Sequence, residues 1–183
     1  MQSYEIESEE RWFNSVATGV VMELMTKRFG LGDPATTYTI GLLHDIGKTA
    51  IDLLHEHKYS EVLDSIEEKQ ITLQEAEKKM FGYDHAEIGA ALLRSWEFPE
   101  SVIQPIEYQF RPNECEQHKK ISSMLHLSKW ICAGIGGAPG THAWAFRLDE
   151  SVFEELKCSE SDALQLMLAS KEEIQHKKDL LKI

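Results

Sequence analysis

The sequence predicts an all-α fold. Apolar residues recur with helical spacing along almost the whole chain, and no run of alternating β-branched residues indicates a strand. Residues 72–75 and 84–87 each place a capping residue three positions before a glutamate, an arrangement that begins many helices. The 183 residues suffice for a sizeable core, so we predict a single domain over residues 1–183.

The N-terminal part predicts two helices joined by a short turn. The first is expected over residues 9–29, and Gly30 favours a left-handed helix end there. Asp33 followed by Pro34 is an N-cap with proline at the first helical position, so a second helix should begin there and end at residues 44–45. The apolar face of the first helix is expected to comprise Trp12, Val16, Val20, Leu24 and Phe29.

Four helices are predicted next. Two are expected over residues 48–57 and 60–70. The capping boxes then begin one helix at Thr72, which Gly82 should end, and another at Asp84.

The C-terminal part predicts helices separated by proline and glycine. A short helix should begin at Pro99, continue through Ile106 and be broken by residues 111–112, Arg-Pro, before a long apolar-faced helix over 118–133. The glycine-rich residues 134–140 follow a helix and lack the Gly-Lys-Ser/Thr ending of a nucleotide loop, so we interpret them as a connecting loop. The closing helices are predicted over 151–157 and 161–182.

Charge and cysteine content limit the possible functions. With 19 basic and 31 acidic residues the net charge is −12, which disfavours binding to nucleic acid or to an anionic membrane surface. The odd number of cysteines argues against a disulfide framework. The chain start lacks a secretory signal, and no apolar stretch is long enough to span a membrane. These features predict a soluble cytoplasmic protein.

The most informative segment is 41–48, Gly-Leu-Leu-His-Asp-Ile-Gly-Lys. Imidazole and carboxylate are ordinary ligands of divalent transition metals, so adjacent His44 and Asp45 at a helix end indicate a possible metal site. Lys48 follows closely enough to neutralise a phosphate. In the alternative interpretation, His44 and Asp45 bond to each other and Gly47 is a left-handed helix cap.

The His44-Asp45 pair and a second motif beginning at Asp84-His85, followed by residues 99–103 and 106–108, resemble the HDOD branch of the HD-type phosphohydrolase superfamily. The resemblance is clearest over residues 11–140. It implies an HD-domain-like orthogonal bundle of helices, a metal centre in the enzymatic members, and a signalling or regulatory role in the bacterial HDOD members. The chain resembles the HD-like half of such proteins, as a short form or as part of something larger.

Matching the ligand pattern residue by residue leaves three donors. His44, Asp45 and His85 match the family's metal-binding positions. The other ligand positions are altered and carry Asn14, Gln109 and Lys129. Amides supply no negative charge, and the Lys129 ammonium would repel an ion, so we expect no two-metal centre. Lys129 is instead expected to pair with Asp45.

We therefore expect a noncatalytic signalling module with no cofactor and with signalling proteins as partners. The alternative is a metal-dependent phosphohydrolase or phosphodiesterase in which His44, Asp45 and His85 hold one manganese or iron ion, and Asp45 and Lys48 assist the chemistry. His85 and Lys48 also have plain interpretations as solvated surface residues. His126, like the remaining histidines, is interpreted as a surface or locally bonded residue.

Overall fold

The computed structural model describes residues 2–55, 59–136 and 146–181. Within these residues the chain is all-α and contains no strand, as predicted. The elements are α1 (Gln2–Phe29), α2 (Pro34–Leu43), α3 (Ile46–Leu54), α4 (Tyr59–Lys69), α5 (Leu73–Phe81), α6 (His85–Ser95), α7 (Glu100–Glu107), the 3-10 turn η1 (Pro112–Glu114), α8 (Lys119–Gly134), α9 (Ser151–Leu156) and α10 (Glu160–Leu181).

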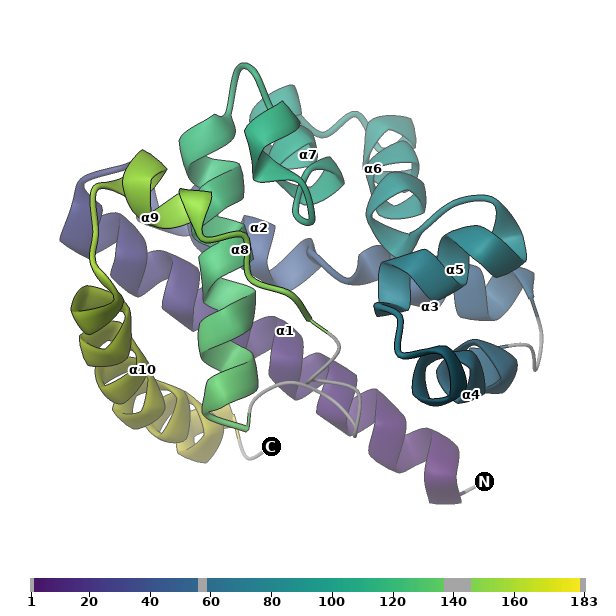
Figure 1. Cartoon of the computed structure of the whole chain (residues 1–183). Helices are drawn as coiled ribbons and strands as arrows, with labels where there is room; N and C mark the ends of the chain where they lie inside the picture. Colours follow the sequence, from purple (N-terminus) through teal and green to yellow (C-terminus); the bar gives the residue numbers. More distant parts are fainter. Residues whose placement is uncertain (1, 56–58, 137–145, 182–183) are drawn as a thin grey trace.

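Helix α1 is the longest helix of the described residues and runs diagonally across the molecule (Figure 1). Helices α2, α8 and α10 pack against it, and α7 and α9 pack against α8. On the other side of the molecule, α3 packs against α6, and α4 packs against α5. The helices cross at large angles (Figure 1), which is the orthogonal bundle that the sequence predicts.

The main core lies where α1, α6, α7 and α8 meet. The aliphatic side chains of these four helices are buried there, which removes apolar surface from water and stabilises the bundle. A smaller cluster joins α4 to α5 through Val62, Ile66 and Ala76. The main core includes the buried residues Val20, Val21, Met25, Leu93, Ile103, Ile106, Leu125, Leu127 and Ile131.

Two glycines let helices approach each other at backbone distance. A Cβ atom on Gly41 of α2 would lie 2.6 Å from Gly19 of α1, and one on Gly47 of α3 would lie 1.9 Å from the carbonyl oxygen of His85. The interpretation of Gly47 as a left-handed cap is therefore wrong. Gly47 lies inside α3, has no positive φ, and allows α3 to contact the start of α6.

Each predicted helix has a counterpart in the structure, and both capping boxes are confirmed. The Thr72 and Asp84 side chains accept hydrogen bonds from the backbone three residues on, and Gly82 ends α5 in the left-handed conformation. Helix α3 begins at Ile46 rather than at Lys48.

Helix α7 ends at Glu107, as expected of a helix that continues through Ile106. Two details of the prediction are wrong. Helix α1 begins at Gln2 instead of residue 9. Trp12 is 49% exposed, because the buried part of α1 begins only at Asn14. Most of the predicted loop over 134–140 lies outside the described residues.

None of the helices in the described part of the chain is both long and apolar enough to cross a membrane.

Candidate functional site

The structure brings the three retained donors of the motif together. His44 caps the C-terminus of α2, Asp45 lies at the N-cap of α3, and His85 is the first residue of α6. All three side chains are buried. Asp45 Oδ1 lies 3.2 Å from His44 Nε2 and 3.4 Å from His85 Nε2. The interpretation of His85 as a solvated residue is therefore wrong.

Both imidazole rings are oriented by a hydrogen bond on the side away from Asp45. His44 Nδ1 lies 2.6 Å from the carbonyl oxygen of Gly41, and His85 Nδ1 lies 2.7 Å from Oε2 of Glu77. A carbonyl or carboxylate oxygen only accepts, so Nδ1 carries the proton in both rings. Nε2 of each ring then faces Asp45. Such outer partners commonly orient metal-binding histidines.

Glu77 is a site residue that the sequence analysis missed. It lies on the buried face of α5 and also accepts a hydrogen bond from the backbone N–H of His85, at 3.0 Å. The signal was present in the sequence, because a glutamate next to Ala76 on the apolar face of a helix requires a buried partner.

The electrostatic environment differs between the two histidines. Burial lowers the pKa of His44, against the pull of the Asp45 charge. Burial also opposes protonation of His85, but the Glu77 charge, the nearby Asp45 carboxylate and the hydrogen bond to Glu77 outweigh it and raise the pKa of that ring. Burial would raise the pKa of Asp45, but the charges of His44, Lys48 and Lys129 hold it well below its usual range.

Two ammonium groups face the Asp45 carboxylate from opposite ends. Lys48 Nζ donates to Asp45 Oδ2 at 2.7 Å, and its side chain is only 12% exposed, so its interpretation as a surface lysine is wrong. Lys129 Nζ lies 3.7 Å from Asp45 Oδ1. Burial lowers the pKa of Lys129 to about 8, although the Asp45 charge opposes this shift.

The altered ligand positions surround the same carboxylate. Asn14 Nδ2 donates to Asp45 Oδ2 at 3.1 Å and lies 3.5 Å from His44 Nε2. Gln109 Nε2 donates to the carbonyl oxygen of His44 at 2.9 Å, and Gln109 Oε1 accepts from Lys129 Nζ at 2.6 Å. The amides and the lysine therefore form a hydrogen-bonded network around Asp45.

Aromatic side chains cover the Lys129 end of this network. The Lys129 ammonium lies 4.2 Å from the ring centroid of Phe110 and 5.8 Å from that of Phe146. The Phe110 ring also meets the His85 ring edge to face, with centroids 5.1 Å apart. Ring faces attract cations, so both rings stabilise the ammonium group.

The residues do not fit the divalent metal ion that the motif implies. Asp45 Oδ1 and His85 Nε2 are buried atoms without a hydrogen-bond partner, which would suit a ligand pair. Among the described residues, however, no three His, Cys, Asp or Glu side chains are placed to hold an ion together. The Asp45 carboxylate already faces the ammonium groups of Lys48 and Lys129, and the Glu77 carboxylate is already bonded to His85. A divalent ion would add uncompensated buried positive charge.

His126 is buried and fully bonded on α8. Its Nδ1 donates to the carbonyl oxygen of Gln109 at 2.8 Å, and its Nε2 accepts from the backbone N–H of Asp149 at 2.9 Å. Of the two interpretations, surface residue or locally bonded residue, the second is correct. The bond to Asp149 also holds the segment before α9 against the core.

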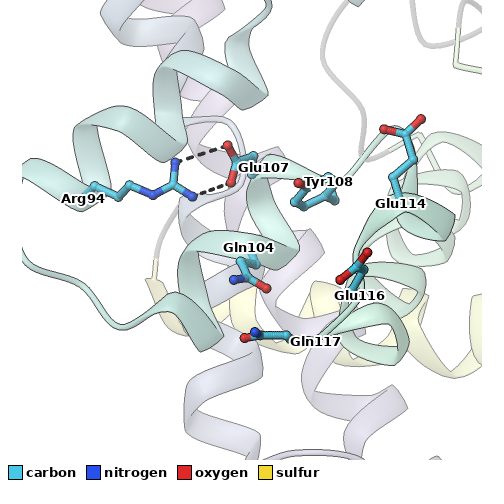
Figure 2. A pocket seen from close by; sticks show the side chains of 7 residues that line it. All are labelled: Arg94, Gln104, Glu107, Tyr108, Glu114, Glu116 and Gln117. Atoms are coloured by element: carbon cyan, nitrogen blue, oxygen red, sulfur yellow. Dashed lines mark hydrogen bonds and ion pairs between the residues drawn. The ribbon is translucent and has the colours of Figure 1, made fainter.

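A surface pocket of about 350 Å³ lies between α6, α7 and the segment before α8 (Figure 2). Arg94 forms ion pairs with Glu107 and Glu100 there. The lining residues are Arg94, Gln104, Glu107, Tyr108, Glu114, Glu116 and Gln117, none of which belongs to the buried centre.

Comparison with known proteins gives a family and a fold. A model of the HDOD domain matches residues 1–112 of the chain. An uncharacterized protein of Treponema pallidum (strain Nichols) is 29% identical over 141 residues, which cover 75% of this chain and 27% of that protein. The chain thus spans little more than a quarter of the length of that relative.

Two solved structures are similar in fold. A candidate signal transduction protein from Marinobacter aquaeolei VT8 superposes with a TM-score of 0.77 at 20% identity, over 94% of this chain and 39% of that chain. A candidate phosphohydrolase from Shewanella amazonensis SB2B superposes with a TM-score of 0.64 at 24% identity, over 91% of this chain and 64% of that chain. At these identities the likeness concerns the fold alone.

Proposed function

The chain belongs to the HDOD domain family, and on that premise we propose that it is a noncatalytic regulatory module of bacterial signal transduction. Its polar centre serves as a structural connection between helices, and its partners are other signalling proteins of the cytoplasm. The Marinobacter relative, which shares the fold, carries the name of a signal transduction protein, and this supports the proposal.

The observation that carries this proposal is the pair of ammonium groups on Asp45. Lys48 Nζ lies 2.7 Å from one carboxylate oxygen and Lys129 Nζ lies 3.7 Å from the other. A divalent ion about 4 Å from one ammonium would be repelled by roughly 8 kcal/mol at an effective dielectric constant of about 20. Without a bound ion, no water is activated for attack on a phosphate, so hydrolysis by this site is not expected.

A second candidate function is phosphodiester or phosphomonoester hydrolysis with one ion on His44, Asp45 and His85. It is favoured by the orientation of the two rings and by the Asp45 Oδ1 and His85 Nε2 atoms, which make no hydrogen bond. The Shewanella relative carries the name of a candidate phosphohydrolase. The positive charge of Lys48 and Lys129 weighs against this candidate.

The two functions are separated by metal content and turnover. We expect purified protein, after incubation with manganese or iron(II) and removal of the excess, to hold far less than one ion per chain by elemental analysis. With a chromogenic phosphodiester substrate and added metal, its rate should equal that of His44→Ala. The proposal fails if the native chain holds one ion per chain and turns over substrate at a rate that His44→Ala loses.

A further inference from the structure

Lys129 is held as a bound cation would be held. Its ammonium donates to Gln109 Oε1 at 2.6 Å and lies 3.7 Å from Asp45 Oδ1. The rings of Phe110 and Phe146 lie 4.2 and 5.8 Å from it. One amide oxygen, one carboxylate oxygen and two ring faces make up an environment that suits a positive charge.

Two histidines that could bind a metal ion lie beside this ammonium, and the Nε2 atom of each ring faces Asp45. The Nδ1 atoms of His44 and His85 are bonded to Gly41 and Glu77, which leaves both Nε2 atoms facing Asp45 Oδ1 at 3.2 and 3.4 Å. Ligands that share one ion at bond lengths of about 2.1 Å are separated by roughly 3.0 to 3.4 Å. The two separations at Asp45 fall in this range, although no three donors are yet placed around one point in the described residues.

We infer that Lys129 is an internal substitute for a metal ion, and that its ammonium closes a latent divalent-metal site formed by His44, Asp45 and His85. Asp45 Oδ1, the oxygen shared by both histidine contacts, is the oxygen that Lys129 faces. Lys48 bonds to Asp45 Oδ2, so it does not block access to Oδ1. The inference rests on the proposed function in one respect, namely that the native chain holds no metal.

The test is metal binding by Lys129 variants, measured by calorimetric titration with manganese or cobalt(II) chloride and by the metal-induced shift in melting temperature. Lys129→Asp should bind one ion per chain at least about 100-fold more tightly than the native protein, since a repelling charge becomes a ligand. Cobalt(II) should also give visible absorption typical of nitrogen and oxygen ligands. Adding His85→Ala to Lys129→Asp should remove this gain.

Two controls separate the position of the charge from its sign. Lys129→Arg keeps a cation and should bind no metal, like the native chain. Lys48→Ala removes an ammonium from the other Asp45 oxygen and should not reproduce the gain, because Lys129 remains in place. If Lys129→Asp fails to fold by circular dichroism, Lys129→Asn replaces it, with the same expectation of a saturable metal isotherm.

The inference is overturned if a folded Lys129→Asp or Lys129→Asn variant binds no more tightly than the native chain, or if Lys48→Ala gains as much. These outcomes leave the noncatalytic proposal intact. Metal binding by the native chain without turnover overturns the inference alone. Metal binding with turnover overturns both, so the two failures are distinguishable.

Discussion

Each oxygen of the Asp45 carboxylate faces a lysine in the buried centre, Oδ2 facing Lys48 and Oδ1 facing Lys129. Buried ion pairs recover little net stability, but removing one partner commonly costs about 3–5 kcal/mol because it leaves a buried charge unpaired. The network is therefore better understood as fixing which residues meet than as the main source of stability.

His126 predicts a pH dependence that belongs to a single side chain. Burial lowers its pKa below 6.5, the Lys129 charge adds to this shift, and the Gln109 carbonyl and the Asp149 charge oppose it. The unfolded chain then binds a proton more readily than the folded chain. The contribution of neutral His126 to stability is complete above about pH 6.5 and is lost as the pH falls toward the lower folded-state pKa.

We expect His126→Gln to flatten this dependence. Between about pH 7 and pH 5, the free energy of unfolding of the native chain should fall more steeply than that of the variant, by at most about 1.4 kcal/mol per pH unit. Urea denaturation at a series of pH values measures both slopes. Equal slopes would show that His126 does not titrate differently in the folded and unfolded chains.

At the scale of single residues, the sequence predicted which residues lie around Asp45, but it did not predict all of the hydrogen-bond partners of these residues. The match to the HDOD pattern placed Asn14, Gln109 and Lys129 around Asp45, and all three lie there. Lys129 was expected to pair with Asp45, but its shorter contact is with Gln109. The sequence places Glu77 on the apolar face of α5, but it does not say which residue Glu77 meets, because that depends on how α5 packs beside the start of α6.

At the scale of helices, the contact between α3 and α6 brings the two halves of the motif together. Gly47 lies against the His85 carbonyl and Gly89, so the backbones approach without an intervening side chain. This approach places Asp45, two residues before Gly47, opposite His85. The position of the donors thus depends on a glycine that is not itself a donor.

Gly47→Ala should therefore destabilise the fold. The added Cβ would lie 1.9 Å from a backbone oxygen, so the helices must separate, and we expect a loss of at least about 2 kcal/mol in the free energy of unfolding. The matched control is Gly89→Ala on the facing helix, whose nearest contact would be 3.2 Å. It should change stability by no more than about 1 kcal/mol, since alanine also favours the helix. Denaturant unfolding that ranks the two variants in the opposite order would contradict this packing.

Helix identity was largely predictable because capping chemistry is local. The Thr72 and Asp84 boxes need only the residues within one turn, and both are present. The exposure of Trp12 was not predictable in the same way. Periodicity identifies a candidate apolar face, but it does not say where along α1 the packing against α2 and α8 begins.

At the scale of the whole molecule, the polar centre connects segments that are distant in the sequence. Asn14 comes from α1, Asp45 from the junction of α2 and α3, His85 from α6 and Lys129 from α8. Hydrogen bonds and ion pairs join all of them to one carboxylate. Spacing along the chain does not predict this meeting, and it was anticipated only through the resemblance to a known family.

X-ray diffraction at the manganese absorption edge, from crystals of the native protein soaked in manganese chloride, examines this centre directly. We predict no anomalous peak within about 2.5 Å of Asp45 Oδ1, with the Lys129 ammonium bonded to Gln109. A strong peak bound by His44, Asp45 and His85, with Lys129 displaced from the site, would contradict the assignment of Lys129 as the resident cation, and if the same protein also hydrolysed a phosphodiester it would contradict the noncatalytic role as well.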